Sequence, residues 1–252
     1  ALQKPTIVVF DMDGTTVRHI NPKLLHFLER LDDISYRAAE LFSKFFSIKK
    51  WRAPMTGIVN RRKKPRLLVH RAIHRFRRKP VEQIVEPCPG IFELMDLFRA
   101  HKLQMALVSN GLGSGYGHDV LRTFGIEKYL GVTLFREDIG KSKPHPDPLL
   151  RALNKLKRKP NKDDVIWYIG DRHKDVKAAI AAQEHLPCPI QPLAYGLNAS
   201  IAILEHGISA EHIITNYEDF SDKMEKMMGK RPTRKKPSGK TNADADQQRA
   251  MF

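Results

Sequence analysis

The sequence predicts an α/β fold, a Rossmann-like parallel sheet into which an all-helical domain is inserted. Along most of the 252 residues, short β-branched apolar runs alternate with segments of helical periodicity. That alternation is typical of parallel strands joined by helices that cover the sheet. Residues 17–87 interrupt it with helical patterns alone. With 41% hydrophobic and 29% charged residues, the chain has the composition of a folded globular protein.

The first expected strand is TIVVF at residues 6–10, whose continuous apolar character suits a strand buried on both faces. Four later runs have the same character: MALVS at 105–109, GVTLF at 131–135, VIWYI at 165–169 and IQPLAY at 190–195. Pro192 weakens the last pattern because proline cannot donate a hydrogen bond to a neighbouring strand.

Helical patterns occupy the segments between these runs. Residues 90–101 place Ile91, Leu94 and Met95 at helical spacing, and further patterns follow at 118–124, 148–156, 174–183 and 217–228. We therefore expect helices on both faces of the sheet.

The interruption at residues 17–87 carries three apolar stripes at helical spacing, at 24–31, 38–46 and 69–76, and no convincing strand. From residue 229 onward the chain is polar and turn-rich, which predicts a disordered tail. The expected organisation is a core of residues 1–16 and 88–228, an inserted helical domain of residues 17–87, and a tail of residues 229–252.

Positive charge is concentrated in two segments. The chain has a formal net charge of +16; thirteen Lys and Arg residues lie in 49–80 and six in 230–240, and neither segment contains an acidic residue. The rest of the chain therefore carries a net charge of −3. A basic segment can attract an anionic partner, such as nucleic acid, a membrane surface or a phosphorylated substrate, or it can simply be solvated.

Two cysteines cannot form a disulfide framework, so a reducing, cytoplasmic setting is expected. No run approaches the roughly 18 apolar residues of a membrane span, and the N-terminal residues do not have the pattern of a secretory signal.

Directly after the first expected strand comes Asp11-Met12-Asp13-Gly14-Thr15. Two carboxylates at this spacing suit a phosphate site, because one can bind a hard cation and attack phosphorus while the other handles a proton. Gly14 permits a sharp turn at the sheet edge where open α/β folds bind their ligands.

This DxDGT segment resembles the first motif of the haloacid dehalogenase-like phosphohydrolases, and three further motifs follow in that family's order. ALVSNG contains Ser109, KPHPDP begins at Lys143, and GDRHKD contains Asp171 and Asp175. Four ordered motifs are far more specific than any single one. The resemblance covers residues 5–17 and 88–220. It is to subfamily I, which includes phosphoglycolate phosphatases and carries a C1-type helical cap where residues 17–87 stand.

The resemblance implies a role for each matching residue. Asp11 would be the nucleophile that forms an aspartyl-phosphate, while Asp13 would protonate the leaving oxygen and then deprotonate the hydrolytic water. Ser109 would hydrogen-bond a phosphoryl oxygen, and Lys143 would neutralise charge in the transition state. Asp13 also favours phosphoryl chemistry, because true dehalogenases of the family lack this second aspartate.

The resemblance further implies Mg²⁺, held by the Asp11 carboxylate, the Asp13 main-chain carbonyl and Asp171, with Asp175 as a further ligand or beside one. The other residues expected to contact phosphate or substrate are Thr15, Asn110, Gly111 and Arg18.

The sequence departs from the family pattern in the cap and beside the motifs. Arg18 and His19 stand where members often have a small Asp-Ser pair, so the substrate of the best-known members is not carried over. Arg172 replaces a small polar residue and would pair at the rim or touch substrate. Of two nearby lysines, Lys143 rather than Lys141 is favoured because it directly precedes a proline.

Glycines alternate at positions 111, 113, 115 and 117. Tyr116 stands where a dinucleotide-binding fingerprint needs Gly or Ala, so we expect a mobile loop beside the phosphate site instead.

The predicted function is Mg²⁺-dependent hydrolysis of a small phosphomonoester. Because the expected cap is basic, this substrate could carry several negative charges. Two alternatives stay open. One is a phosphomutase on the same fold. The other is a protein that binds nucleic acid or anionic lipid through its basic cap and tail. The sequence leaves the oligomeric state open.

Overall fold

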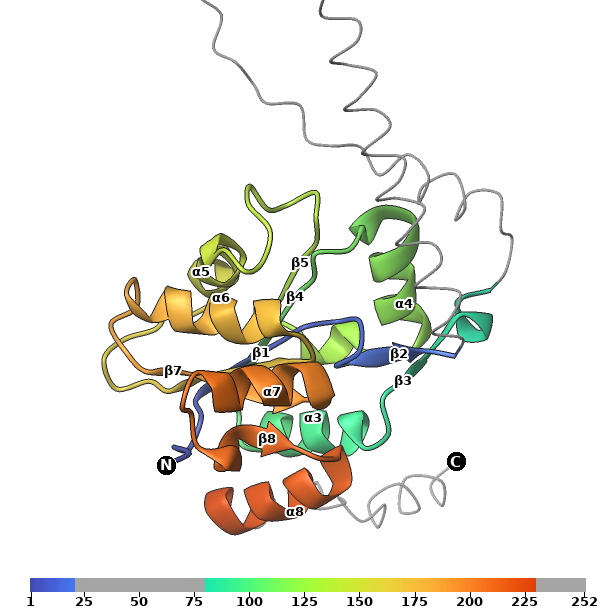
Figure 1. The fold of residues 1–252 in the computed structure, drawn as a ribbon. Helices are drawn as coiled ribbons and strands as arrows, with labels where there is room; N and C mark the ends of the chain where they lie inside the picture. The colour runs from blue at the N-terminus through green and yellow to red at the C-terminus, as the bar shows by residue number, and fades with distance from the viewer. Residues whose placement is uncertain (21–79, 230–252) are drawn as a thin grey trace, which may run out of the picture.

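The computed structural model describes residues 1–20 and 80–229. Their centre is a six-stranded sheet in the order β5-β4-β1-β6-β7-β8, with every neighbouring pair parallel (Figure 1). The strands are β1 (Ile7–Phe10), β4 (Gln104–Val108), β5 (Val132–Leu134), β6 (Ile166–Gly170), β7 (Ile190–Tyr195) and β8 (Ile213–Ile214). The predicted α/β parallel sheet is confirmed: each expected run contains a strand, and β8 is an addition. The helices expected within residues 21–79 and the expected tail lie outside the described residues.

Within the described ranges, six α-helices surround the sheet: α3 (Ile91–Ala100), α4 (His118–Thr123), α5 (Asp147–Lys155), α6 (His173–Gln183), α7 (Leu197–Glu205) and α8 (Tyr217–Met228). Single turns occur at η1 (Val81–Gln83), η2 (Gly113–Gly117), η3 (Glu127–Tyr129) and η4 (Ala210–His212). Sequence periodicity predicted all of the α-helices except α7. That helix is apolar on both sides, with Leu197 and Leu204 exposed and Ile203 buried, so it lacks the contrast between faces that periodicity detects.

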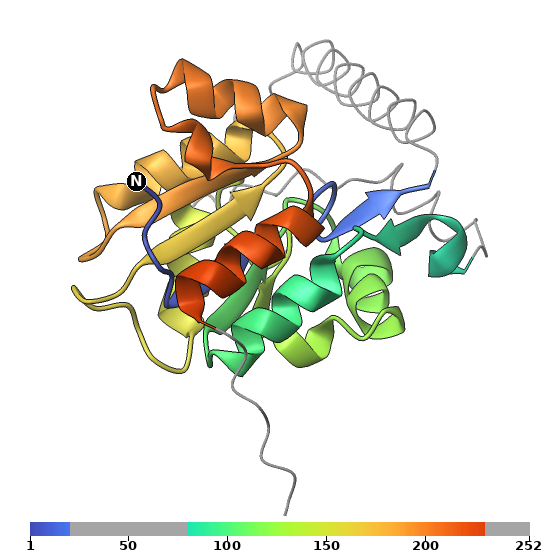
Figure 2. The ribbon, with the colours of Figure 1, turned by 90° about the horizontal axis from the view of Figure 1, so that it is seen from below.

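Alternate residues of β1 supply two separate cores. Ile7 and Val9 pack in a cluster with residues of α5 and α6, whereas Val8 and Phe10 pack with residues of α3 and α8. This is the period of two expected of a strand buried on both faces. Figure 2 shows α3 and α8 crossing one face of the sheet together.

The two ends of the predicted all-helical segment are strands. β2 (Val17–His19) and β3 (Val85–Pro87) pair antiparallel, with Arg18 opposite Glu86. The prediction that residues 17–87 contain no strand is therefore wrong at both ends. Three-residue strands show little alternation, and these two lie more than sixty residues apart in sequence, so only the folded chain brings them together.

Pro192 lies inside β7 although it cannot donate to a neighbouring strand. β8 pairs only with Ala194 and Tyr195, beyond the proline. Beside Pro192 stands His212, whose Nδ1 lies 2.8 Å from the Pro192 carbonyl oxygen. The short β8 thus avoids the position where a main-chain donor is missing.

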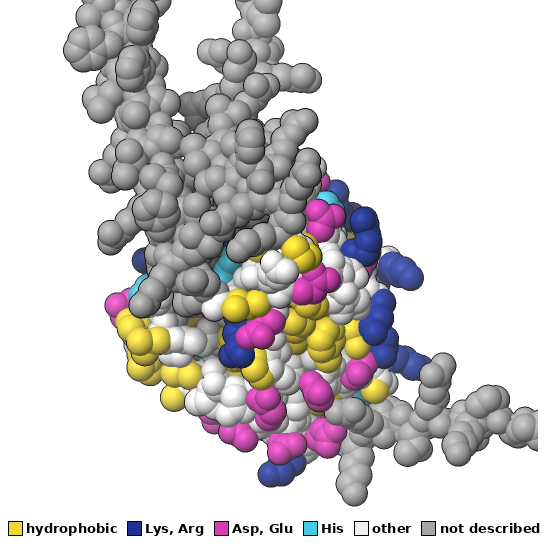
Figure 3. All heavy atoms as spheres, turned by 90° about the vertical axis from the view of Figure 1, so that its right-hand side faces the viewer, with side chains coloured by type: hydrophobic (Ala, Val, Ile, Leu, Met, Phe, Trp, Pro, Cys, Tyr) yellow, Lys and Arg dark blue, Asp and Glu magenta, His cyan; other side chains and the backbone are white. Residues whose placement is uncertain are grey.

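Acidic and basic side chains share the surface of the described residues. Figure 3 shows one face, on which Lys and Arg gather along one side and Asp and Glu lie mainly along the lower part. No helix of the described residues is long and apolar enough to cross a bilayer. The two cysteines, Cys88 and Cys188, are buried and unpaired.

The sheet order determines where the motif residues meet. β1 lies between β4 and β6, so the segments that follow these three strands leave the same edge side by side. They carry Asp11 after β1, Ser109 after β4 and Asp171 after β6.

Candidate active site

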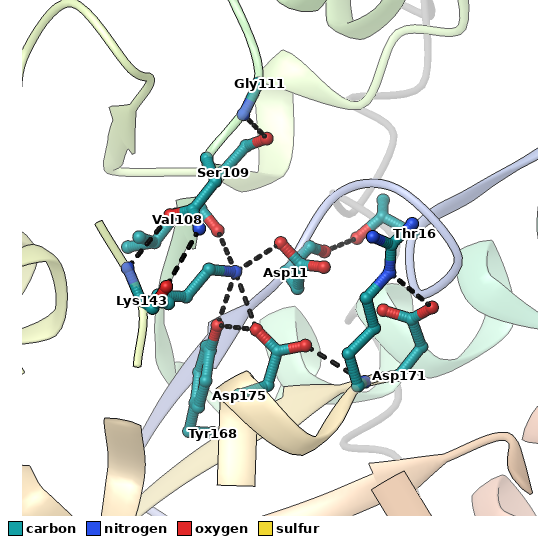
Figure 4. A network of polar contacts seen from close by, with 11 residues as sticks. Asp11, Thr16, Val108, Ser109, Gly111, Lys143, Tyr168, Asp171 and Asp175 are labelled. Carbon is teal, nitrogen blue, oxygen red and sulfur yellow. Dashed lines mark hydrogen bonds and ion pairs between the residues drawn. The ribbon is translucent and has the colours of Figure 1, made fainter. Parts of the chain in front are cut away.

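Asp11 and Lys143 form the centre of the site, and both are buried. Lys143 Nζ donates to Asp11 Oδ1 over 2.5 Å and to the Val108 carbonyl oxygen over 3.2 Å. Thr16 Oγ1 donates to the Asp11 main-chain oxygen over 2.7 Å, which fixes the turn after β1 (Figure 4). The nucleophile and the cation predicted from the sequence are therefore in direct contact.

Asp175 and Tyr168 hold the other side of the lysine. Lys143 Nζ lies 2.7 Å from Asp175 Oδ1 and 2.8 Å from Tyr168 Oη, and the Tyr168 hydroxyl donates to Asp175 Oδ1 over 2.9 Å. The second Asp175 oxygen accepts the Arg172 main-chain N–H over 3.0 Å. Because both of its oxygens are already bonded, Asp175 is suited to orienting Lys143 and the start of α6.

Asp171 faces this cluster with an unsatisfied oxygen. Carboxylate oxygens of Asp11, Asp171 and Asp175 all lie within 4.8 Å of one another. Asp171 Oδ1 is buried and has no hydrogen-bond partner among the residues that the structure describes. A buried carboxylate oxygen without a partner is costly unless a cation binds it. The set contains only oxygen donors, which fits a hard divalent cation such as Mg²⁺.

Gly14 makes the approach of Asp171 possible. It adopts a φ of +86°, and a Cβ atom there would lie 2.2 Å from Asp171 Oδ2. Gly170 is similarly constrained, since its Cβ would lie 2.3 Å from Asp175 Cβ. The glycines of the first and fourth motifs therefore let the acidic side chains come close to the backbone.

The crowded carboxylates respond to burial and to one another. Burial raises the pKa of Asp11 to about 6, although Lys143 acts in the opposite direction. Burial also raises the pKa of Asp171 to about 7, and the charges of Asp11 and Asp175 add to this effect. Burial disfavours the charged form of Lys143, but the two carboxylates beside it outweigh that and raise its pKa. The raised pKa values of Asp11 and Asp171 mean that the positive charge near them is too small to keep both carboxylates ionised. A bound cation would supply the missing charge.

Burial likewise disfavours ionisation of Asp175, yet the charge of Lys143 and the hydrogen bonds that Asp175 accepts hold its pKa below the ordinary value. Asp175 therefore stays an anion beside the lysine.

Ser109 and Asn110 shape the loop after β4. Ser109 Oγ accepts the Gly111 main-chain N–H over 2.9 Å, so the hydroxyl is held in place and keeps its hydrogen as a donor. The Asn110 side chain accepts from the Lys143 main-chain N–H over 3.1 Å and donates to the Lys143 carbonyl oxygen over 3.2 Å. Its side chain therefore holds the lysine loop, and the expected contact of Asn110 with phosphate stays a prediction.

Asp13 is held by two residues that the motifs did not include. Tyr116 donates its hydroxyl to Asp13 Oδ1 over 2.7 Å, and His19 Nε2 lies 3.6 Å from the same oxygen. Burial would raise the pKa of Asp13, but His19 and Tyr116 lower it below the ordinary value. The sequence analysis gave neither residue a role at the site, because neither belongs to a motif.

Arg18 is not brought to Asp13. Its Nε bonds Glu86 across the β2–β3 pair over 2.7 Å, and its side chain is half exposed. Neighbouring residues of a strand point to opposite faces, and His19 is the one that faces Asp13. The expected substrate contact of Arg18 therefore has no support in this placement.

The remaining predicted residues have varied surroundings. Thr15 is fully buried and its Oγ1 has no hydrogen-bond partner within the described part of the chain. Arg172 lies beside the cluster, with Nε 3.7 Å from Asp171 Oδ2. Lys141 is exposed, and its Nζ lies 3.2 Å from His145 Nε2. The choice of Lys143 over Lys141 agrees with this placement.

Comparison with known proteins decides the family. The model of the haloacid dehalogenase-like hydrolases matches residues 8–185, more than half of the chain. The chain belongs to this family. Its four motifs are therefore those of a haloacid dehalogenase-like hydrolase, as the resemblance implied.

Two curated proteins similar to this chain are both named phosphoglycolate phosphatase. Phosphoglycolate phosphatase of Salmonella choleraesuis is 31% identical over 134 residues, which is 53% of this chain and 48% of the relative. Phosphoglycolate phosphatase of Escherichia coli is 31% identical over 115 residues, 46% of this chain and 42% of the relative. The chain thus spans about half the length of the curated relatives it matches.

Solved structures share the fold. A predicted phosphoglycolate phosphatase from Haemophilus somnus is 19% identical, with a TM-score of 0.57 over 88% of this chain and 99% of its own. A HAD-superfamily hydrolase from Ehrlichia chaffeensis is also 19% identical, with a TM-score of 0.55 over 90% and 100%. At this identity the likeness concerns the haloacid dehalogenase-like fold.

Proposed function

We propose that this protein is a phosphatase that hydrolyses a small phosphomonoester through an aspartyl-phosphate on Asp11 and depends on Mg²⁺. The observation that carries the proposal is the placement of the Asp11 carboxylate. It lies 2.5 Å from the Lys143 ammonium and shares one edge of the sheet with Asp13, Ser109 and Asp171. A nucleophile, a cation, a proton carrier and a hydroxyl donor are therefore brought to the same edge of the sheet.

Each residue has a part in the proposed reaction. Asp11 attacks phosphorus, and the bond from phosphorus to the leaving oxygen breaks as protonated Asp13 gives that oxygen its proton. Because the pKa of Asp13 is lowered in the free protein, Asp13 would take up this proton when the negatively charged phosphate ester binds beside it. Water then attacks the aspartyl-phosphate, loses a proton to Asp13, and restores the Asp11 carboxylate. Ser109 donates to a phosphoryl oxygen, and Lys143 stabilises the charge that develops on the transferring group.

The cation would be held by Asp11, Asp171 and the main-chain carbonyl of Asp13. When bound, it would neutralise the carboxylates and orient the phosphoryl group for in-line attack. Asp175 supports the arrangement through Lys143, because both of its carboxylate oxygens already accept hydrogen bonds.

The decisive variant is Asp11→Asn, which keeps the size of the side chain and removes the nucleophile. We expect kcat to fall by at least about a thousandfold, because the remaining residues of the site offer no second group to carry the phosphoryl. Asp163→Asn, at an exposed position, is the matched control and should keep full activity. Near-full activity of Asp11→Asn would refute the mechanism.

The substrate is best found with a panel of phosphorylated metabolites, assayed by phosphate release with and without Mg²⁺. The panel should include 2-phosphoglycolate, because the curated relatives are phosphoglycolate phosphatases. Addition of EDTA should abolish turnover, and Mg²⁺ should restore it.

A phosphomutase on the same fold is the alternative within the family. It would pass the phosphoryl group to a second hydroxyl instead of water. Mass spectrometry of the products separates the two, since a mutase yields an isomeric phosphate ester and releases no inorganic phosphate.

The alternative of nucleic-acid or anionic-lipid binding rests on the basic segments 49–80 and 230–240, most of which lie outside the described residues. Retention on heparin and on anionic vesicles over a salt series, with and without residues 230–252, tests it.

A further inference from the structure

We propose that Tyr116 and His19 are positioning residues that hold Oδ1 of Asp13, so that Oδ2 is the oxygen that exchanges protons with the leaving group and with water. The inference rests on the proposed function and assigns that site two residues outside the four motifs. It also divides the two oxygens of one carboxylate between different tasks.

The contacts around Oδ1 form a short chain of hydrogen bonds. The Tyr116 hydroxyl donates to Asp13 Oδ1 over 2.7 Å, and the Tyr116 oxygen lies 3.2 Å from His19 Nε2. A phenol has one hydrogen, which goes to Asp13, so Nε2 of His19 must carry the hydrogen of the second bond. The His19 and Tyr116 rings also stack, with centroids 6.2 Å apart and planes 17° apart.

The tyrosine is itself held firmly. Tyr116 is only 5% exposed, and it belongs to the glycine-rich turn η2. Cβ atoms at Gly113 and Gly117 would lie 2.7 and 2.2 Å from ring atoms of Phe135, so both glycines seat the turn directly on that ring. The turn predicted as a mobile loop therefore has contacts that fix the tyrosine hydroxyl.

Two further hydrogen bonds close the turn. Glu137 accepts the main-chain N–H groups of Gly113 and Ser114 over 2.9 and 3.1 Å. A buried hydroxyl on a turn held at both sides can orient the carboxylate it binds.

The second carboxylate oxygen of Asp13, Oδ2, lies toward the loop that follows β4. A Cβ built on Gly111 would be 3.4 Å from Asp13 Oδ2 and 3.1 Å from Ser109 Oγ. Oδ2 and the Ser109 hydroxyl therefore flank the same small space. Rotation of the carboxylate would exchange its two oxygens, and the bond from Tyr116 to Oδ1 opposes that rotation.

The geometry assigns the proton transfers to Oδ2 in both steps. When the bond from phosphorus to the leaving oxygen breaks, that oxygen takes the proton from Oδ2. When water attacks the phosphoenzyme, Oδ2 takes a proton from the water and the bond between phosphorus and Asp11 breaks. Loss of the Tyr116 hydroxyl leaves Asp13 chemically intact but free to turn away from both tasks.

Leaving-group basicity tests this role. Phenyl phosphate and 4-nitrophenyl phosphate are similar in shape, but phenolate is the stronger base and needs the proton more. For Tyr116→Phe we expect kcat/KM to fall about 10- to 100-fold with phenyl phosphate and less than about threefold with 4-nitrophenyl phosphate.

The second step gives an independent signature. With 4-nitrophenyl phosphate, formation of the phosphoenzyme should stay fast in Tyr116→Phe while its hydrolysis slows. A rapid burst of about one nitrophenolate per active site should then precede the steady state.

Tyr129→Phe is the matched control. The Tyr129 hydroxyl also donates to an aspartate, Asp96 Oδ1, over 3.1 Å, but outside the site. It should change neither the ratio between the two substrates nor the time course.

His19 supplies a second pair of variants in case Tyr116→Phe does not fold. His19→Leu removes the donor to Tyr116 and should shift the substrate ratio in the same direction. His19→Gln keeps an N–H donor and should restore most of the wild-type ratio.

The outcomes separate the two proposals. Equal losses on both substrates, or no loss on either, would overturn the positioning role while the phosphatase stands. A wild-type protein that releases phosphate from neither compound nor from any member of the metabolite panel would overturn the proposed function, and this inference with it.

Discussion

Replacement of Lys143 by methionine removes the cation between two buried carboxylates while keeping most of the side-chain volume. In the folded chain, Lys143 Nζ lies 2.5 Å from Asp11 Oδ1 and 2.7 Å from Asp175 Oδ1, and the lysine side chain is inaccessible to solvent. The variant leaves Asp11, Asp171 and Asp175 facing one another with a deficit of positive charge.

Two magnitudes follow from this geometry. Removal of one partner of a buried ion pair typically destabilises a protein by about 3–5 kcal/mol. With a urea slope of about 2 kcal/mol/M, the unfolding midpoint should fall by about 1.5–2.5 M. Activity should fall by about 10²–10³ in kcat, the usual effect of removing one preorganised group that stabilises transition-state charge.

Lys141→Met provides the control, because that lysine is exposed, lies two residues away and has its Nζ 3.2 Å from His145 Nε2, outside the buried cluster. Urea unfolding by circular dichroism and phosphate release should be measured for both variants in the same buffer. The reasoning fails if Lys143→Met loses less than about 1 kcal/mol of stability and less than tenfold activity. It fails equally if Lys141→Met loses as much.

Two further predictions concern the turn and the carboxylates. Gly14→Ala should destabilise the protein and weaken Mg²⁺ binding, because its Cβ would lie 2.2 Å from Asp171 Oδ2; calorimetry measures the binding. The control is Gly207→Ala, which is also at positive φ but has open space around it. It should lower the stability by only about 1 kcal/mol and leave Mg²⁺ binding unchanged. In EDTA, stability should fall as pH rises from 5 to 7.5, because the pKa values of about 6 for Asp11 and about 7 for Asp171 mean that the folded chain binds more protons than the unfolded chain in this window. Within this window the loss from Asp11 is on the order of 1 kcal/mol, because the rest of its shift acts below pH 5. Groups with lowered pKa values are ionised in both states above pH 5 and do not contribute. Urea midpoints across this range should show the fall, Mg²⁺ should reverse it at pH 7.5, and a rise with pH would contradict the assignment.

Local sequence patterns predicted most of the described fold, because strands buried on both faces are continuous apolar runs and amphipathic helices repeat every 3.6 residues. Where the local signal is weak, prediction failed. α7 is apolar on both sides, β8 has only two residues, and the β2–β3 pair depends on contacts between distant segments. The inserted helical domain expected over residues 17–87 and the disordered tail expected over residues 229–252 lie mostly outside the described residues and stay predictions.

The site divides in a similar way. Asp11, Asp13, Ser109, Lys143 and Asp171 could be predicted from sequence because each stands in a short motif. Asp11, Ser109 and Asp171 directly follow strands, whereas Lys143 precedes a proline in the loop before α5. Tyr168 could have been suspected, since a tyrosine inside a fully buried strand needs a partner for its hydroxyl.

By itself, the sequence determined the order of the four motifs along the chain and predicted which residues carry the chemistry, because motif chemistry depends on residue type and local spacing. Only the tertiary structure decided how they are used. It shows that His19 rather than Arg18 faces Asp13, that Asn110 holds the lysine loop, and that Tyr116 reaches Asp13 from a turn 103 residues away. The physical reason is that the orientation of side chains and their hydrogen-bond partners arise from packing between segments far apart in sequence. Local spacing along the chain does not report that packing.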